Sequence, residues 1–220
     1  MDPTARADLS RTWALVPIRG LETAKTRLGE DLDAEERVEL VTRLLRQTLI
    51  ATRDARRIDG TIVVTMDPAA AGIAKELRAV GLVERAPGLN EAIAAARSVA
   101  IARGATAILV LPADLPSVAA GSVDELLARA SAADAASTID EITALVALVP
   151  DRHGQGTNAL VVSPPDAIAP AFGSESRAEH QRAATAAGAR YLELDGPLSL
   201  DLDTPADLIA AEAALGSLRG

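Results

Sequence analysis

Hydrophobic residues occur with two different spacings, which alternate along the chain. Short apolar runs are typical of strands buried on both faces of a sheet, and they predict seven strands. These are Trp13–Ile18, Thr61–Thr65, Leu82–Arg85, Ala107–Leu111, Ala144–Val149, Ala159–Ser163 and Tyr191–Leu194. Between the runs, apolar residues recur every three or four positions, which is the spacing of one helix face. The helices predicted in this way are residues 34–51, 68–80, 89–103, 118–132, 172–187 and 205–215.

The order of these elements predicts an α/β fold. Strands alternate with helices in the first half of the chain, which favours a mostly parallel sheet. In the third quarter, the glycine-rich segment Pro150–Asn158 joins two strands. It is typical of a hairpin or irregular loop, so we expect an antiparallel addition that forms one wall of a cleft. A length of 220 residues fits a single domain, with the polar residues 1–11 as a flexible amino terminus.

The amino-acid composition excludes or disfavours several classes of binding partner and site. Aromatic residues make up only 1% of the chain, so the core must be aliphatic and a site built on aromatic stacking is excluded. The net charge of −9 disfavours nucleic acids and anionic membranes as partners. There is no cysteine and therefore no thiolate nucleophile or thiolate zinc site. We see neither a signal peptide nor a run of roughly 20 apolar residues, so we expect a cytoplasmic protein.

Acidic residues stand where two apolar runs end. Asp114 follows the run Ala107–Leu111 on a turn between two prolines, and Asp201 and Asp203 immediately precede the last predicted helix. Residues i and i+2 of an extended chain point the same way, about 6–7 Å apart. One of the latter pair could simply cap the helix. Three clustered carboxylates are costly without a cation, and oxygen ligands suit Mg²⁺, so we expect these aspartates to meet around this metal.

Basic residues concentrate in the loop after the first predicted strand. The segment Gly20–Arg27 faintly resembles a phosphate-binding P-loop, but it lacks the glycine directly before the lysine. Two interpretations remain. Arg19, Lys25 and Arg27 either face the phosphates of a ligand as movable cations, or form a solvated basic loop.

Three further segments could bind an anion or a nucleotide, and each has an ordinary structural alternative. The glycine-rich segment Pro150–Asn158, which contains Thr157, either offers backbone amides to an anion or is a plain hairpin. The turn of Gly173 and Ser174, with Ser176 beyond it, offers free amides at a helix start, or only caps the helix. Gly88 and Asn90 could contact a base or ribose, or Asn90 could cap the next helix. We expect His153 in a surface loop and His180 packed one turn beyond Ser176.

Taken together and in order, these segments resemble the phosphoenolpyruvate/2-phospho-L-lactate guanylyltransferase family of coenzyme F-420 biosynthesis. The resemblance covers about residues 13–215. It is carried by the segments Val16–Ile18, Lys25–Leu28, Gly88–Asn90, Leu111–Pro116, Gly156–Leu160, Phe172–His180 and Asp201–Pro205. One departure is Arg19, where we expect a lysine in many relatives; the positive charge is kept, although the two side chains bind phosphate differently.

The resemblance implies a single-domain Rossmann-like, GT-A-like nucleotidyltransferase. It implies transfer of GMP from GTP, with two Mg²⁺ ions, to a three-carbon phosphorylated acid, and delivery of the product to the F-420 transferase enzyme. It also implies which residues form each site. The metal ligands are Asp114, Asp201 and Asp203; the catalytic residues are Asp114 and Lys25; the nucleotide contacts are Arg19, Lys25, Arg27, Gly88 and Asn90; the acceptor contacts are Thr157, Gly173 and Ser176.

Alternatives remain open at this point. The acceptor could be phosphoenolpyruvate, 2-phospholactate or 3-phosphoglycerate, and we favour phosphoenolpyruvate. A related enzyme that acts on molybdopterin or a sugar phosphate would usually carry a glycine-rich signature after its first strand, which is absent here. From a different class, the chain could be a non-catalytic Mg²⁺-binding α/β module, and failure to bind any nucleotide would favour it.

Overall fold

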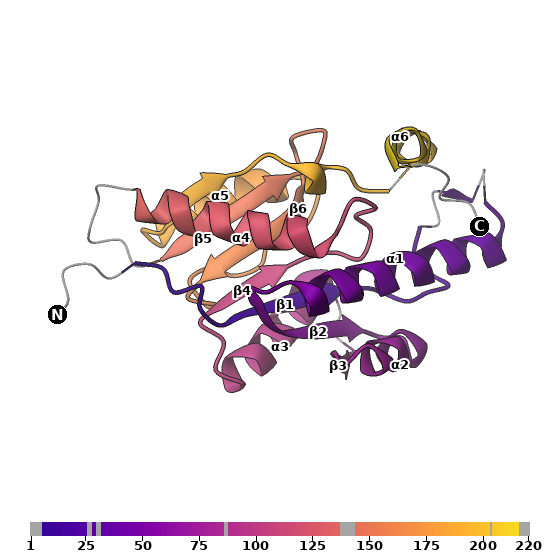
Figure 1. Ribbon diagram of the computed structural model, residues 1–220, viewed down its shortest axis with the longest axis horizontal. Helices are drawn as coiled ribbons and strands as arrows, with labels where there is room; N and C mark the ends of the chain where they lie inside the picture. Colours follow the sequence, from indigo (N-terminus) through magenta and orange to yellow (C-terminus); the bar gives the residue numbers. More distant parts are fainter. Residues whose placement is uncertain are drawn as a thin grey trace.

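One seven-stranded sheet forms the centre of the molecule. The computed structural model describes residues 6–25, 28–29, 32–85, 88–136, 144–202 and 204–215. The strand order is β3-β2-β1-β4-β6-β5-β7. Figure 1 shows the sheet between the helices that cover it. The strands are β1 (Thr12–Pro17), β2 (Ile58–Thr65), β3 (Val80–Val83), β4 (Ala107–Val110), β5 (Leu145–Pro150), β6 (Thr157–Ser163) and β7 (Arg190–Glu193). This is the α/β domain with a mostly parallel sheet that the sequence predicts.

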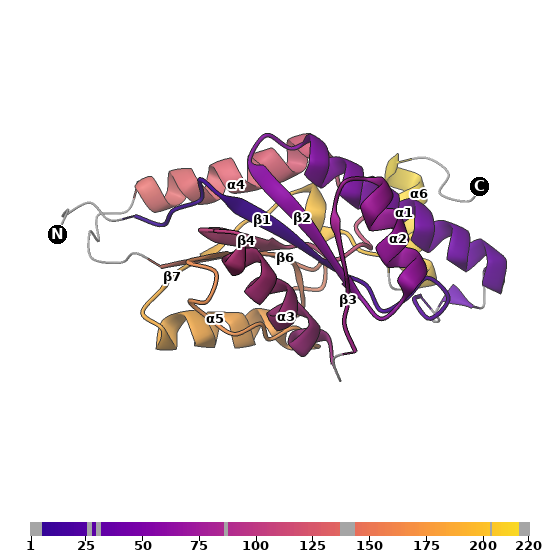
Figure 2. The same cartoon turned by 90° about the horizontal axis from the view of Figure 1, so that it is seen from below.

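Helices cover both faces of the sheet. They are α1 (Ala34–Asp54), α2 (Pro68–Glu76), α3 (Leu89–Ala102), α4 (Ala120–Ala135), α5 (Ser176–Ala186) and α6 (Pro205–Leu215), with a short 3-10 helix, η2 (Pro197–Ser199). Figure 2 shows α1, α2 and α4 on one face and α3 and α5 on the other. Successive side chains of a strand point to opposite faces of the sheet, so β1 contributes to the core on both faces. Leu15 packs in the cluster that contains α3, and Val16 packs in the cluster that contains α1 and α2.

The antiparallel addition is a single strand inserted into the sheet. β6 pairs antiparallel with both β4 and β5, whereas the described pairings of the other strands are parallel. β6 therefore starts where the others end. The register pairs Val110 with Leu160, so Thr157 and Asn158 lie beside the chain that leaves β4. Residues predicted to act together from distant parts of the sequence consequently share one edge of the sheet.

Several element boundaries differ from the prediction, and close packing explains the clearest case. The second helix was expected to reach Val80 and to end at Gly81, but α2 ends at Glu76 and both residues belong to β3. Arg78 has a φ of 65°, which terminates the helix. A Cβ at Gly81 would lie 2.5 Å from the Ala71 carbonyl oxygen. This glycine thus lets β3 approach α2, rather than ending the helix.

The fifth helix is shorter than predicted. It was expected from Phe172 but begins at Ser176, after a turn closed by a hydrogen bond from Ser176 N to the Gly173 carbonyl at 3.2 Å. Phe172 is instead held by contacts outside the helix, which are described below. The turn of Gly173 and Ser174 that the sequence suggested at the helix start therefore lies before the helix and is not part of it.

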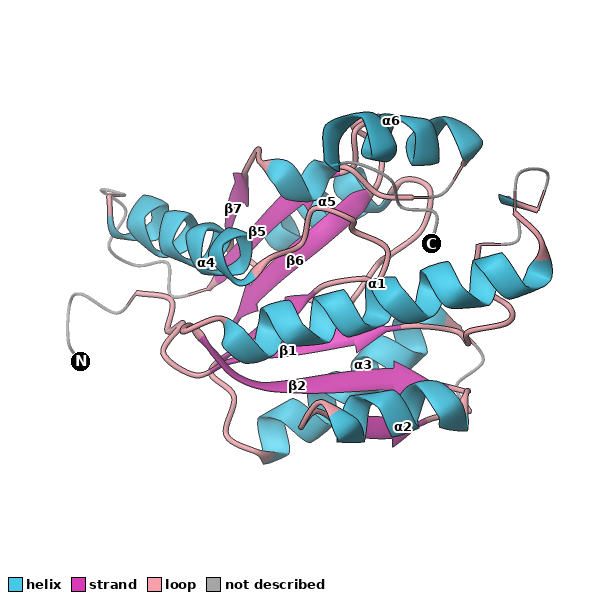
Figure 3. Cartoon of the chain, turned by 45° about the vertical axis from the view of Figure 1, so that its right-hand side comes forward, coloured by secondary structure: helices cyan, strands magenta, loops and turns pink. Residues whose placement is uncertain are grey.

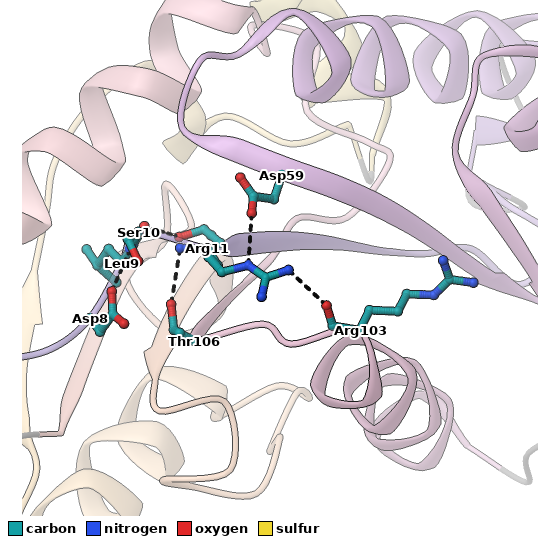
Figure 4. A network of polar contacts seen from close by, with 8 residues as sticks. Asp8, Leu9, Ser10, Arg11, Asp59, Arg103 and Thr106 are labelled. Carbon is teal, nitrogen blue, oxygen red and sulfur yellow. Dashed lines mark hydrogen bonds and ion pairs between the residues drawn. The ribbon is translucent and has the colours of Figure 1, made fainter.

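The amino-terminal end of the sheet is fastened by a polar network around Arg11 (Figure 4). Its backbone N–H donates to Thr106 Oγ1 at 3.1 Å, and its guanidinium donates to Asp59 and to the Arg103 carbonyl. Residues 6 and 7 also bond to Asp134, so part of the expected flexible terminus has fixed partners; residues 1–5 lie outside the described ranges. Among the described helices, none is both long and apolar enough for a membrane span.

Candidate active site

The carboxyl ends of β1 and β4 open into a cavity of about 410 Å³. Prolines line it on both sides, and its charged lining residues are Arg19, Lys25 and Asp114. Open α/β sheets bind ligands at this edge, because the loops that follow the strands diverge there. The structure thus brings the predicted acidic turn and the predicted basic loop to the same cavity.

Lys25 and Asp114 form an ion pair in this cavity. Lys25 Nζ lies 2.8 Å from Asp114 Oδ2, and the two side chains are 9% and 26% exposed. Lys25 also has a φ of 57°, which is uncommon for a residue with a Cβ. Strained backbone of this kind persists only where surrounding contacts enforce it, and it is found often at functional sites. Lys25 is therefore not a solvated residue, whereas Arg19 of the same loop is exposed.

Asp67 holds the basic loop in place, a role that the sequence did not suggest. It is the N-cap of α2, directly before Pro68, and Oδ1 accepts the Ala69 N–H at 2.8 Å. Its second oxygen, Oδ2, accepts the Leu21 N–H at 2.9 Å. One carboxylate therefore caps the helix and fixes the loop that carries Lys25. Arg27 lies outside the described residues.

The segment with Asp201 runs directly beside Asp114. Leu202 N donates to the Asp114 carbonyl at 3.1 Å, and Asp201 Oδ1 lies 3.5 Å from the buried amide nitrogen of Asn158. Asp203 lies outside the described residues. Within the described part of the chain, no three acidic, histidine or cysteine side chains form a metal-binding group. Two of the three predicted ligands are thus placed on neighbouring segments, and the third position is not described.

A capping box fixes the turn between Asp201 and α6. Thr204 N donates to Asp207 Oδ2 at 2.6 Å, and Asp207 N lies 3.3 Å from Thr204 Oγ1. Because Thr204 is the cap, Asp201 is not used in that role. Arg152, from the loop between β5 and β6, reaches the buried Asp207 at 2.5 Å. Leu202 and Leu208 pack in one cluster with leucines of α1, and Figure 3 shows α6 beside α1.

Three buried polar side chains meet where β6 begins and α5 starts. Ser176 Oγ and Thr157 Oγ1 are 3.1 Å apart, and Thr157 Oγ1 lies 3.1 Å from His180 Nδ1. His180 Nε2 accepts the Ala171 N–H at 3.1 Å. A backbone N–H can only donate, so the hydrogen of the neutral imidazole sits on Nδ1 and points at Thr157. Burial lowers the pKa of His180 to about 4, which keeps this ring neutral near pH 7.

Gly173 and Asn90 shape the space next to these hydroxyls. An added Cβ at Gly173 would meet nothing within 4 Å, so its backbone faces open space. Asn90 clamps Phe172 from both sides, since Nδ2 donates to the Phe172 carbonyl at 3.0 Å and Oδ1 accepts its N–H at 2.7 Å. Phe172 in turn lines the cavity and packs edge-on against His180. Asn90 lies inside α3 and does not cap it.

The glycine-rich loop between β5 and β6 bonds to itself and to α5. Gln155 N donates to Asp151 Oδ1 at 2.9 Å, and Gly154 N donates to the Asp151 carbonyl at 3.0 Å. Arg177 N donates to the Gln155 carbonyl, and its side chain to the Gly154 carbonyl. These amides are occupied within the loop, which favours the plain hairpin over an anion site. His153 in the same loop is exposed, as expected.

A smaller cavity of about 170 Å³ adjoins the first and shares its lining by Pro17, Ile18, Arg19 and Leu89. Gly88, a predicted nucleotide contact, lines this second cavity at the start of α3. Glu84 lines it as well, and it was not singled out from the sequence. Its only sequence signal is a carboxylate directly after an apolar run, the same signal that marked Asp114.

Comparisons with known proteins point to one family. A family described as "Guanylyl transferase CofC like" matches residues 12–212. The chain is 41% identical to the phosphoenolpyruvate guanylyltransferase of Sphaerobacter thermophilus, over 94% of this chain and 96% of that protein. It is 38% identical to the enzyme of the same name from Conexibacter woesei, over 95% and 91%.

Solved structures support the fold. A nucleotidyl transferase from Methanothermobacter superposes with a TM-score of 0.59 at 15% identity, covering 93% of this chain and 97% of that one. A 4-diphosphocytidyl-2C-methyl-D-erythritol synthase superposes with a TM-score of 0.60 at 14% identity, covering 92% and 97%. At these identities the likeness concerns the fold, and it confirms the predicted nucleotidyltransferase architecture.

Proposed function

The chain belongs to the guanylyl transferase CofC-like family, and from this premise we propose that it transfers GMP from GTP to phosphoenolpyruvate in coenzyme F-420 biosynthesis. Diphosphate is the second product. The observation that carries the proposal is the ion pair of Lys25 and Asp114 in a strand-end cavity, with the Asp201 segment hydrogen-bonded alongside. It supplies both a cation for phosphates and carboxylates for a metal at one place.

Nucleotide phosphates are assigned to the basic side of the larger cavity. Lys25 and Arg19 line it, and Arg27 is proposed to join them from the same loop. A lysine that is 9% exposed keeps a strong field at short range, because little water screens it. Gly88 and Asn90 are proposed to position the nucleoside, Asn90 through its clamp on Phe172.

The acceptor is assigned to Thr157, Gly173 and Ser176. Thr157 Oγ1 accepts from Ser176 Oγ and faces His180 Nδ1, which leaves the Thr157 O–H to donate to a ligand, and the backbone at Gly173 faces open space. A donor without bulk suits a small phosphorylated acid. An acceptor phosphate oxygen is already anionic, so attack on the α-phosphorus of GTP requires no general base. The protein's own contribution is to position both reactants and to neutralise their charge.

Mg²⁺ fits the donors at this site. Carboxylate oxygens are the ligands it prefers, and Asp114 and Asp201 lie on segments joined by a backbone hydrogen bond. We propose that these two residues, with Asp203, hold the ion. When bound, Mg²⁺ neutralises phosphate charge and orients the reacting oxygens. Lys25, which now pairs with Asp114, would then be available to the phosphates.

Two wider expectations belong to the same proposal. The reactants are small molecules, and we expect the product to pass to the F-420 transferase enzyme. We also expect the reaction to take place in the cytoplasm. Neither expectation depends on the residue assignments above.

A nucleotide–acceptor activity matrix tests the proposal. GTP, ATP, CTP and UTP are each combined with phosphoenolpyruvate, 2-phospholactate and 3-phosphoglycerate in the presence of Mg²⁺, and diphosphate release is measured. We expect release with GTP and phosphoenolpyruvate above all other pairs. Release with no pair at all would reject the proposed activity.

The variant Asp114→Asn tests the site assignment in the same assay. It should lower turnover by roughly 100-fold or more, because a ligand and charge partner at the reacting centre is lost. Asp166→Asn makes the same chemical change at an exposed residue and should keep wild-type turnover. Near-normal transfer by Asp114→Asn, with intact circular dichroism, would remove Asp114 from the mechanism.

A further inference from the structure

The lining of the smaller cavity suits a flat ring. It lies where β1, β2 and β3 end, and apolar side chains make up much of its wall. Met66 and Leu89 are 58% and 40% exposed, which is unusual for large apolar residues. Two exposed apolar side chains at one cavity are suited to contact the faces of a planar group. Because the cavity shares its lining with the Lys25 cavity, such a group could be joined to phosphates bound there.

Glu84 provides an unused acceptor in this pocket. Its backbone N–H donates to the Thr65 carbonyl at 2.9 Å, which extends the β2–β3 pairing by one residue and fixes its position. The side chain is half-buried, and its carboxylate makes no hydrogen bond or ion pair with any described residue. The Thr65 hydroxyl is already engaged, since it accepts from Asp67 N and donates to the Arg19 carbonyl.

The chemistry of a carboxylate selects among nucleobases. An ionised carboxylate only accepts hydrogen bonds, and its two oxygens can receive two parallel donors. Guanine presents such a pair, N1–H and the N2 amino group, side by side on one edge. Adenine presents the N1 acceptor there, and cytosine presents the N3 acceptor, so both would set a lone pair against the negative charge. Uracil offers a single N3–H between two carbonyl oxygens.

We propose that Glu84 is the specificity-determining residue for guanine, accepting N1–H and N2–H of the base with its two carboxylate oxygens. This inference rests on the proposed function for the presence of a guanine nucleotide. The inference adds to that function the residue that distinguishes guanine from other bases, since contacts to the phosphates and to the acceptor do not involve the base. A role for Glu84 on ribose hydroxyls is the competing assignment, and the test separates the two.

Xanthine nucleotides give the sharpest test. Xanthine keeps N1–H but has a carbonyl oxygen in place of the N2 amino group. The Glu84 carboxylate should therefore repel it, whereas the amide of Glu84→Gln would accept N1–H and donate to the C2 oxygen. The preference of the protein for GTP over XTP should fall, and reverse, in this variant. The expected loss for GTP is roughly 10- to 100-fold, as for a charged hydrogen-bond pair.

Binding and turnover are measured separately. Titration calorimetry without acceptor gives the Kd of GTP and XTP for the wild type, Glu84→Gln and Glu125→Gln; diphosphate release is then recorded with phosphoenolpyruvate. Glu125 is an exposed glutamate on α4, so its variant should behave as the wild type. Circular dichroism confirms that each variant is folded.

The outcomes are distinct. A reversed GTP:XTP preference in Glu84→Gln supports the inference, and it does so even if no acceptor gives turnover, which would reject only the proposed function. Equal weakening of GTP and XTP would assign Glu84 to ribose or structure and overturn the inference, while wild-type turnover of GTP would leave the function intact. Wild-type binding that favours ATP over GTP would also overturn it.

Discussion

His180 should make the stability of the protein sensitive to acid. The imidazole is fully buried, and its two nitrogens bond to Thr157 and to the Ala171 N–H. Burial lowers the pKa from 6.5 to about 4, because the charged ring would lose its water and would face a backbone N–H. In the unfolded chain the ring regains its ordinary pKa.

The sign of the effect follows from proton uptake. Between pH 6.5 and about 4, His180 binds a proton in the unfolded state but not in the folded state, so acid favours unfolding. The contribution of neutral His180 is fully present above pH 6.5 and is lost as pH falls toward 4. A shift of this size amounts to about 3 kcal/mol in full, of which about 2 kcal/mol is lost by pH 5.

Urea unfolding near pH 7 and near pH 5 measures this loss. Wild type and His180→Gln are compared, with His153→Gln as a control because His153 is the other histidine of the chain and is exposed. His180→Gln should be less stable near pH 7 but should lose about 2 kcal/mol less than the wild type on acidification. The control should follow the wild type. Equal acid-induced losses in wild type and His180→Gln would refute the buried neutral ring.

Two further predictions concern the acceptor side and the last helix. Ser176→Ala should raise the KM for the acceptor more than that for GTP, because its hydroxyl bonds to Thr157 at the proposed acceptor site; equal effects in steady-state kinetics would contradict that assignment. Arg152→Met should lower the free energy of urea unfolding by about 1–2 kcal/mol, since it removes the cation that faces buried Asp207. Arg182→Met, which breaks an exposed pair, should cost less than about 0.5 kcal/mol. An equal loss in both arginine variants would contradict a special role for the first.

The parts of the fold that the sequence predicted are those decided by local chemistry. The predicted starts of the first two helices, at residues 34 and 68, are confirmed. Asp33 accepts N–H groups in a capping box before α1, and Pro68 stands at the start of α2, so a few adjacent residues decide each start. The acidic turn after β4 was likewise predicted from its apolar run and its prolines. Its position at the strand end required no knowledge of the other strands.

Prediction failed where packing between distant residues decides the outcome. The second helix was expected to reach Val80, but Val80 and Gly81 lie in β3, where the close backbone of Ala71 leaves no room for a Cβ at Gly81. Asn90 was considered as a cap and instead clamps Phe172. Glu84 passed unnoticed since its significance lies in a cavity formed by three strands. Contacts of this kind cannot be predicted from the sequence pattern of a single segment.

The distribution of charge explains how a chain with a negative net charge can bind two anionic reactants. The net charge of −9 is spread over a surface where salt screens it beyond about 8–10 Å. Lys25 is nearly buried, so little water screens its field at the cavity once a bound cation, in place of the lysine, neutralises Asp114. The hydroxyls of Thr157 and Ser176 and the neutral ring of His180 add donors without adding charge. Short-range fields therefore decide which small anions bind, whereas net charge governs only large polyanions.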